Sequence, residues 1–237
     1  MNSSFKSAAR SGASALLHAD AGLIEAAVSQ LLIDSLPEHV SLWSVWHDQL
    51  SAAGSGFFEW LSLEERERAG RFHFERDHTF FVLGRGFLRW LLGESLDADP
   101  ASLELASGPA GKPFLSGRHA GQLHFNLSHS GGLMICAVSA KTEVGVDIER
   151  IRAMPEAEGI LESHFPFDSA AAWRRLPNEQ QPEAFLRLWV RHEARVKRSG
   201  LGLAQQEKEE SRRATEESVF EFVPAAGFVG ALAVNCV

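Results

Sequence analysis

The stretch Gly145-Val146-Asp147-Ile148-Glu149 predicts a β-strand that carries two carboxylates on one face. From Val144 to Ile148, valine and isoleucine alternate with the other residues, as they do in a half-buried strand. This alternation places the side chains of Asp147 and Glu149 on the same face. Acidic residues alternate with apolar ones on many half-exposed strands that have no function, so the pair alone does not identify a site.

A second segment, Trp189-Val190-Arg191-His192-Glu193-Ala194-Arg195-Val196-Lys197, has the pattern of a helix. Glu193 and Lys197 are four residues apart and are therefore neighbours on one side of it. Surface ion pairs with this spacing are common and contribute only ~0.3–0.5 kcal/mol. If the helix packs on the strand, however, the carboxylates of Asp147, Glu149 and Glu193 converge with the Lys197 ammonium. Such a cluster suits a hard divalent cation and a phosphate ester.

The composition is that of an ordinary soluble globular protein. The chain has 237 residues, of which 45% are hydrophobic and 23% charged, enough for one large domain or two small ones. A net charge of −8 argues against general nucleic-acid binding. We expect no membrane segment, since no apolar run approaches the ~18 residues needed to cross a bilayer. Cys136 lies in an apolar run, which favours a buried free thiol over a disulfide with Cys236. A free thiol in turn fits a reducing compartment such as the cytoplasm.

Hydrophobic spacing predicts an α+β chain in which the order strand, helices, strands occurs twice. This doubling indicates two similar halves, at residues 39–141 and 142–237, after a partly flexible N-terminal extension at 1–38. Within the extension, Leu23–Ile33 is expected to form an amphipathic helix.

Several individual elements can be predicted as well. Ser62-Leu63-Glu64-Glu65 has the capping-box pattern of a helix start. Phe165–Gln181 is expected to be a loop, and the charged segment Glu207–Ser218 a mobile turn or an exposed helix end. The other expected helices are Asp77–Leu92, a helical stretch that begins at Pro155, and Glu183–Arg198. A first strand is expected to begin at Val40, and the other expected strands are Gln122–Leu127, Leu133–Val138, Thr142–Ile148, Val219–Val223 and Phe228–Val234.

Two turns carry groups that could contact a phosphate. In Gly111-Lys112-Pro113, the lysine stands between glycine and proline, so its ammonium is presented from a defined turn. The segment Asn126–Gly132 runs from a strand end into a glycine-rich turn. That turn offers backbone amides, the Ser128 hydroxyl and the His129 imidazole to an anion. Each pattern also fits a plain solvated turn.

Other patterns are less specific. A Ser–His hydrolase is disfavoured, because the adjacent Ser128 and His129 point apart and no acid is evident to orient the imidazole. The spacing of five between His119, His124 and His129 does not gather ligands on one face, so we reject a zinc site. The arginines from Arg66 to Arg76 fit either a solvated helix face or a phosphate contact.

Taken in order, these motifs resemble the Sfp-type 4′-phosphopantetheinyl transferases of the holo-acyl-carrier-protein synthase superfamily, over roughly residues 40–235. The resemblance implies an α+β pseudodimer of two similar α/β halves, with the active site in the cleft between them. It also implies transfer of 4′-phosphopantetheine from coenzyme A to a serine of an apo acyl- or peptidyl-carrier protein, with release of adenosine 3′,5′-bisphosphate. The motifs are Gly111-Lys112-Pro113, Phe125-Asn126-Leu127-Ser128-His129-Ser130, Gly145-Val146-Asp147-Ile148-Glu149, Trp189-x-x-x-Glu193-Ala194-x-x-Lys197 and Gly200-Leu201-Gly202-Leu203.

The resemblance further implies roles for individual residues. In the second half, Asp147, Glu149 and Glu193 would bind Mg²⁺, and Lys197 would neutralise the pyrophosphate. The proton of the attacking serine would pass to Glu193 or to a metal-bound water, and the sequence does not choose between them. In the first half, the coenzyme A contacts would be Lys112, Ser128, His129 and Arg68, the last two near the 3′-phosphate.

The chain departs from the family pattern at two places. His192 replaces a lysine of the helix motif, and an ordinary histidine is only partly charged at neutral pH. On the second helix, His78-Thr79-Phe80-Phe81 stands where many members carry basic residues, which affects part of the 3′-phosphate pocket. A catalytically degenerate coenzyme A- or carrier-binding protein is therefore the main alternative, and a metal-dependent phosphodiesterase is a third reading.

The expected partner is a carrier protein of fatty-acid, polyketide or nonribosomal peptide synthesis. The enzyme itself is expected to be a monomer in the cytoplasm. Phe165, Phe167 and Trp173 are apolar candidates for docking this partner, with core packing as the more ordinary explanation.

Overall fold

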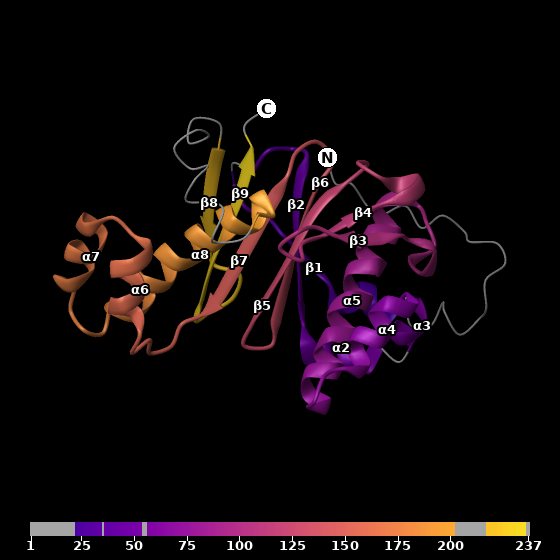
Figure 1. Ribbon diagram of the computed structural model, residues 1–237, viewed down its shortest axis with the longest axis horizontal. Coiled ribbons are helices and arrows are strands. Elements are labelled where there is room, and N and C mark those ends of the chain that lie inside the picture. Colours follow the sequence, from indigo (N-terminus) through magenta and orange to yellow (C-terminus); the bar gives the residue numbers. More distant parts are fainter. Residues whose placement is uncertain (1–21, 35, 54–55, 202–216, 236–237) are drawn as a thin grey trace.

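The computed structural model describes residues 22–34, 36–53, 56–201 and 217–235, and it contains two antiparallel sheets side by side (Figure 1). The first sheet has the strand order β1-β2-β6-β5, the second has the order β7-β9-β8, and β3 and β4 form a separate pair. The strands are β1 (Ser29–Leu31), β2 (Val40–Trp46), β3 (Leu105–Ser107), β4 (Pro113–Leu115), β5 (His124–Ser130), β6 (Leu133–Ser139), β7 (Val144–Arg150), β8 (Glu217–Phe222) and β9 (Phe228–Asn235).

Two long helices and several short ones surround these sheets. The capping box expected at Ser62 is confirmed: its hydroxyl accepts from Glu65 N, and the Glu65 carboxylate accepts from Ser62 N. The longest helix of the second half ends at Ser199, and Gly200 after it takes the left-handed conformation that is common just past a helix C-terminus. The helices are α2 (His47–Ala53), α3 (Phe57–Trp60), α4 (Leu63–Gly70), α5 (Glu75–Leu96), α6 (Ala157–His164), α7 (Phe167–Arg174) and α8 (Gln181–Ser199), with 3₁₀ turns at Pro100–Ser102 and Gly117–His119.

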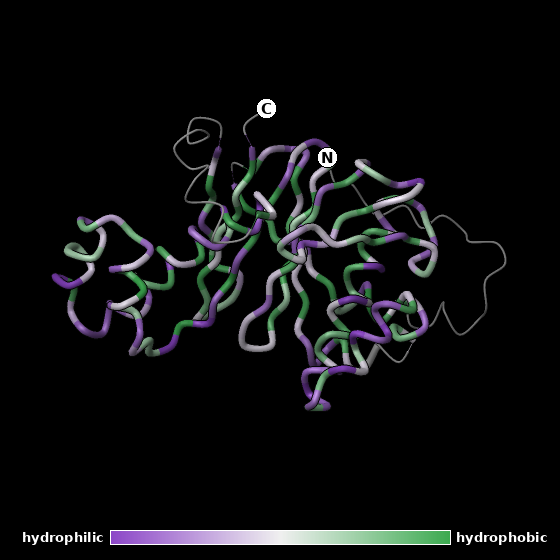
Figure 2. Tube along the Cα trace, in the orientation of Figure 1, coloured by the Kyte–Doolittle hydropathy of each residue, from purple (hydrophilic) through white to green (hydrophobic). Residues whose placement is uncertain are grey.

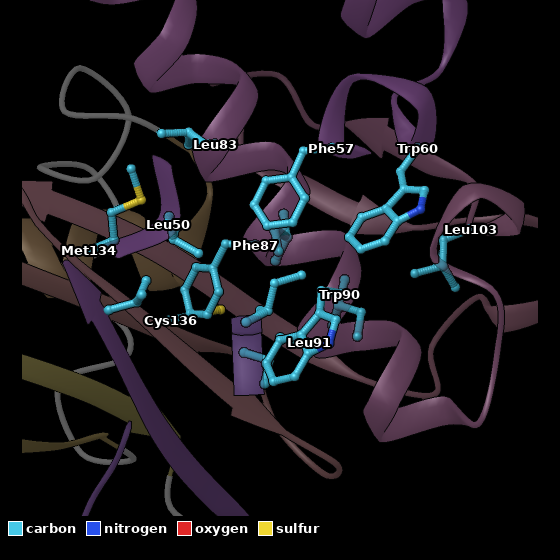
Figure 3. Close-up of a cluster of buried hydrophobic side chains, with 14 of the residues drawn as sticks. Leu50, Phe57, Trp60, Leu83, Phe87, Trp90, Leu91, Leu103, Met134 and Cys136 are labelled. Atoms are coloured by element: carbon cyan, nitrogen blue, oxygen red, sulfur yellow. The ribbon is translucent and has the colours of Figure 1, made fainter. Parts of the chain in front are cut away.

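The core of the first half lies between α5 and the first sheet. Figure 3 shows Phe87 and Leu91 of this helix among aromatic and aliphatic side chains that include Phe57 and Trp60. Alternation along β6 explains the packing, since Met134 and two further side chains on the same face point into this cluster. All the side chains of that strand are buried, because it is covered on both faces.

The opposite face of β6 packs against the second half. Leu133 and Ile135 join Val146 and Leu232 in a buried cluster that draws on both sheets. The other face of the second sheet is covered by α8, together with α6 and α7. The order is therefore α5, first sheet, second sheet, α8, and hydrophobic residues run along the central strands (Figure 2). The expected α+β fold is confirmed.

Two sequence predictions of secondary structure were wrong. Phe165–Gln181 is not a loop throughout, because α7 (Phe167–Arg174) lies inside it and buries Ala170 against its neighbours. Its two turns are too short to show a helical period in the sequence. The helix expected at Leu23–Ile33 covers only residues 22–27, and β1 follows, because pairing with β2 at the sheet edge outweighs helical propensity there.

Three further expectations concern individual segments. Cys136 is buried and free, as predicted, while Cys236 lies outside the described residues. Most of Glu207–Ser218 lies outside them as well. Among the helices that the structure describes, none combines the length and the apolar character needed to span a membrane.

Candidate active site

The candidate site lies where β7 packs against α8, and Gly145 makes this approach possible. A Cβ at Gly145 would lie 2.1 Å from the Ala194 carbonyl oxygen and 2.2 Å from the Arg198 nitrogen. Only glycine therefore lets the helix backbone lie this close to the strand. Because Asp147 and Glu149 share the face of Gly145, the close contact brings both carboxylates to the helix side that carries Glu193 and Lys197.

Asp147 is the most buried acid of this site, with 5% of its surface exposed. Its Oδ1 accepts hydrogen bonds from Lys197 Nζ at 2.6 Å and from Ser128 Oγ at 2.8 Å. Its Oδ2 is buried and has no hydrogen-bond partner among the described residues. A buried carboxylate oxygen without a partner is costly, so this atom is suited to an additional ligand.

The other two acids complete a region of concentrated negative charge. Glu149 Oε2 accepts from Ser130 Oγ at 2.8 Å and from Arg152 Nη1 at 2.9 Å. Burial, and then the charge of Asp147, raise the pKa of Glu193, against the opposing effect of Lys197. Burial likewise raises the pKa of Asp147 although Lys197 and Ser128 oppose it. The structure thus brings Asp147 and Lys197 into direct contact and places Glu193 within electrostatic range of Asp147, Glu149 and Lys197.

The donor set fits a hard cation. As they stand, no three His, Cys, Asp or Glu side chains in the described ranges are grouped closely enough to hold a metal ion. However, Asp147 Oδ2 is buried without a partner among the described residues, and the three carboxylates face only two cationic groups, Lys197 and Arg152. A cation bound by these oxygens would offset the excess negative charge.

Strand β5 holds β7 through a ladder of side chains. Asn126 Oδ1 accepts from Val146 N at 2.9 Å, and Ser128 Oγ accepts from Ile148 N at 3.3 Å. Ser130 Oγ accepts from Arg150 N at 3.1 Å. We call these three contacts the β5–β7 ladder. They advance by two residues on both strands, so the strands run in the same direction and the two halves meet along this seam.

A cavity of about 780 Å³ opens in the first half beside this seam. The Arg68 and Arg85 guanidinium groups lie 5.3 and 5.6 Å from the centre of the Phe81 ring. Burial lowers the pKa of Arg85, with the charges of Arg68 and Arg89 adding to the effect and Glu65 opposing it. Arg68, Arg76 and Arg85 line the cavity against one acid, Asp77, so an anion bound there would meet an excess of positive charge. The lining of the cavity includes Arg68, Arg76, Phe80, Phe81, Arg85 and His129.

His129 connects the cavity with the acidic cluster. Its ring packs edge-on against Phe80, with 4.6 Å between ring centres, and it is exposed toward the cavity. The protein packed around the ring, and then the charge of Lys197, lower the pKa of His129. The predicted His129 and Arg68 thus share one cavity, which lies within electrostatic range of Lys197.

Lys112 and Ser128 lie in different surroundings. Lys112 Nζ donates to Glu143 Oε2 at 2.6 Å and to the Val144 and Arg198 carbonyl oxygens at 3.0 Å, so it ties the first half to both elements at one end of the β7–α8 contact. It lines a separate cavity of about 330 Å³. The Ser128 hydroxyl is occupied by Asp147, Ile148 N and Lys197. Contacts of these two residues with coenzyme A remain predictions.

His192, the departure from the family motif, lies in an aromatic group on α8. Its ring is 5.5 Å from Phe165 and 6.0 Å from Trp189 between centres. Of the docking candidates, Phe165 and Trp173 pack against the core between α6, α7 and α8. Phe167 is 79% exposed at the start of α7.

The sequence patterns did not identify two residues that the structure places at the candidate site, Arg85 and Ser130. Arg85 was overlooked because it lies inside an apolar helix, although a charge within such a pattern is itself a signal. Ser130 had been given no role, because nothing in the sequence shows which side chain its hydroxyl contacts.

Comparisons with known proteins cover most of the chain. Residues 41–141 match a family model described as 4′-phosphopantetheinyl transferase, N-terminal, and residues 143–222 match one described as 4′-phosphopantetheinyl transferase superfamily.

Individual relatives are also named as phosphopantetheinyl transferases. The 4′-phosphopantetheinyl transferase HetI of Nostoc sp. is 34% identical over 210 residues, which are 84% of this chain and 89% of that protein. The 4′-phosphopantetheinyl transferase Sfp of Bacillus subtilis is 28% identical over 148 residues, 62% of this chain and 64% of that protein. A human L-aminoadipate-semialdehyde dehydrogenase-phosphopantetheinyl transferase is 31% identical over 149 residues, 59% of this chain and 48% of that protein.

Proposed function

Since the chain belongs to the 4′-phosphopantetheinyl transferase superfamily, we propose that it transfers 4′-phosphopantetheine from coenzyme A to a serine of an acyl- or peptidyl-carrier protein. The observation that carries this proposal is the juxtaposition of two sites of opposite charge. The carboxylates of Asp147, Glu149 and Glu193 suit a hard cation, and the neighbouring cavity with Arg68 and Arg85 suits a phosphate.

The reaction requires charge neutralisation and alignment. The carrier serine oxygen bonds to the phosphorus next to pantetheine, and the bond from that phosphorus to the bridging oxygen breaks. The electron pair leaves with adenosine 3′,5′-bisphosphate, and the serine proton must pass to a base, for which Glu193 is our candidate. Asp147, Glu149 and Glu193 would hold Mg²⁺, which when bound neutralises charge on the pyrophosphate.

Lys197 stands between the two sites. Its ammonium contacts Asp147 and Ser128, and its charge reaches His129 at the cavity. A pyrophosphate placed here would meet a fixed positive charge, which stabilises the charge that develops on its oxygens.

The adenosine bisphosphate end of coenzyme A would occupy the cavity. The residues predicted to contact the 3′-phosphate, Arg68 and His129, both line this cavity. Arg76 and Arg85 line it as well. These two further arginines supply basic groups on α5, where the His78-Thr79-Phe80-Phe81 segment lacks them. The volume of about 780 Å³ is within the range of small-molecule sites.

We further propose that the protein acts as a cytoplasmic monomer and that Phe167 contacts the carrier. This residue is largely exposed, whereas Phe165 and Trp173 pack into the core. Exposed aromatic residues often anchor protein partners.

The test is an assay of the full-length protein with coenzyme A, Mg²⁺ and a small panel of apo-carrier proteins. Mass spectrometry would detect the pantetheine arm on the carrier, and chromatography would detect adenosine 3′,5′-bisphosphate. A carrier whose acceptor serine is changed to alanine is the matched control, because it docks but offers no nucleophile.

Three outcomes separate the hypotheses. Modification of the serine-containing carrier alone supports the transferase. Binding of coenzyme A and carrier without modification supports the degenerate binding protein. Release of the bisphosphate at the same rate with no carrier present would support a phosphodiesterase and contradict the proposal.

A further inference from the structure

Within the described part of the chain, each of the two serines of the β5–β7 ladder has a second hydrogen bond, to a carboxylate, which Asn126 does not make. Ser128 Oγ donates to Asp147 at 2.8 Å, and Ser130 Oγ donates to Glu149 at 2.8 Å. Both also accept a backbone N–H of β7. Asn126 accepts the Val146 N–H and serves only the strand contact in this ladder. Strand β5 of the first half therefore contacts two candidate ligands of the second half.

The geometry at Ser130 fixes the direction of its proton. Because its oxygen accepts from Arg150 N at 3.1 Å, the hydroxyl hydrogen is directed to Glu149 Oε2. Arg152 also donates to this oxygen, but its side chain is 51% exposed and long. The serine is short and fixed to a strand, so it restricts rotation of the carboxylate more strongly.

We propose that Ser130 is a positioning residue that holds Glu149 in the orientation needed to bind a divalent cation. This inference rests on the proposed function, in which Glu149 is a metal ligand. The first half then sets the metal affinity of the second half through a hydrogen bond to its ligand. Ser128 stands in the same relation to Asp147, but its additional contact with Lys197 makes it a less clean test.

The experiment measures Mn²⁺ binding to the full-length protein by electron paramagnetic resonance, since Mn²⁺ prefers the same oxygen ligands as Mg²⁺. Ser130→Ala is expected to weaken Mn²⁺ binding about tenfold, as is usual for hydrogen-bond partners of metal ligands. Asn126→Ala is the matched control. This substitution removes the hydrogen bond to the buried Val146 N–H, so it should lower the thermal midpoint at least as much as Ser130→Ala does. The Mn²⁺ affinity of Asn126→Ala should nevertheless stay within about twofold of wild type.

Ser130→Ala could bind Mn²⁺ weakly only because it folds poorly, so two further variants of nearly equal side-chain shape, Ser130→Thr and Ser130→Val, are compared with each other. Ser130→Thr retains the hydroxyl and is expected to keep Mn²⁺ affinity near wild type, whereas Ser130→Val lacks it and should bind weakly. Equal affinity of these two variants would overturn the proposal. So would equal weakening by Asn126→Ala and Ser130→Ala.

The wild-type protein separates this proposal from the proposed function. If it binds no Mn²⁺, or if Asp147→Ala leaves Mn²⁺ binding unchanged, the metal assignment and the positioning role are both wrong. If it binds Mn²⁺ and modifies a carrier while every Ser130 variant binds Mn²⁺ normally, only the positioning role is wrong.

Discussion

The long helices α5 and α8 have the same structural task but bring different charged groups to the two parts of the candidate site. Each covers the outer face of its sheet and contributes buried side chains to the core. Yet α5 presents Arg76 and Arg85 to the cavity, while α8 presents Glu193 to the carboxylates of β7. The comparison suggests a division of labour under the proposed function, in which the first half would supply cationic groups for phosphate and the second acidic groups for a cation.

Each region carries an excess of one charge: three arginines and one acid, Asp77, line the cavity, while three carboxylates face Lys197 and Arg152 at the β7–α8 contact. Burial and neighbouring cations lower the pKa of Arg85, while burial and Asp147 raise the pKa of Glu193. A substrate bearing phosphates together with a divalent cation would relieve both effects at once. Four predictions test this division between the halves, from the largest expected effect to the smallest.

Removal of a carboxylate from the second half should have the largest effect. Asp147→Ala and Glu193→Ala are each expected to lower carrier modification by at least about a hundred- to a thousandfold, since each removes electrostatic stabilisation of the reacting groups. Circular dichroism should show a folded protein. Glu183→Ala is the control, because Glu183 lies on the same helix but pairs with Arg187 at its start. Retained activity in both site variants would contradict the metal assignment.

The close contact of β7 and α8 can be broken directly. Gly145→Ala places a methyl group 2.1 Å from the Ala194 carbonyl oxygen, so it should destabilise the protein by about 1–3 kcal/mol. Urea denaturation would measure this loss. Gly159→Ala in α6 meets no atom within 4 Å and should be neutral or stabilising. Equal stability of the two variants would show that helix and strand do not need glycine to approach.

A change in the first half should affect binding rather than chemistry. Arg85→Gln is expected to raise KM for coenzyme A about tenfold, in line with ~1.5 kcal/mol for a hydrogen bond to a charged group, and to leave kcat nearly unchanged. Steady-state kinetics would separate the two constants. Arg71→Gln, at an exposed position outside the cavity, serves as the control. A drop in kcat with constant KM would contradict the division of roles.

The smallest effect is expected at His192. His192→Lys restores the residue of the family motif, so it should hold or slightly raise the rate at mildly alkaline pH, where lysine is charged and an ordinary histidine is not. A rate profile against pH for both proteins would measure this. A large loss of activity would show that the histidine has a role of its own.

The local parts of the site could be predicted from the sequence because they follow from periodicity. Alternation placed Asp147 and Glu149 on one face, and the spacing of four placed Glu193 beside Lys197. Their convergence could only be expected, since it depends on a tertiary contact that Gly145 permits. Arg85 and Ser130 could not be assigned, because their roles come from neighbours distant in the sequence.

The same limit explains the errors in the fold. Helix α7 has only eight residues, too few to show a helical period, although its three consecutive alanines favour a helix. Strand β1 exists through pairing with β2, which local propensity does not encode. Lys112 is a similar case, since its three acceptors include the Arg198 carbonyl, 86 residues further along the chain.

The buried cluster shared by the two sheets has a consequence for dissecting the protein. One buried cluster combines residues of both halves, Leu133 and Ile135 with Val146 and Leu232. Each half synthesised alone would therefore expose a hydrophobic patch that promotes aggregation. Fragments cut between Ser139 and Val144 should therefore precipitate when made separately but reassemble when co-expressed. In this respect the chain behaves as an obligate complex whose subunits happen to share one polypeptide.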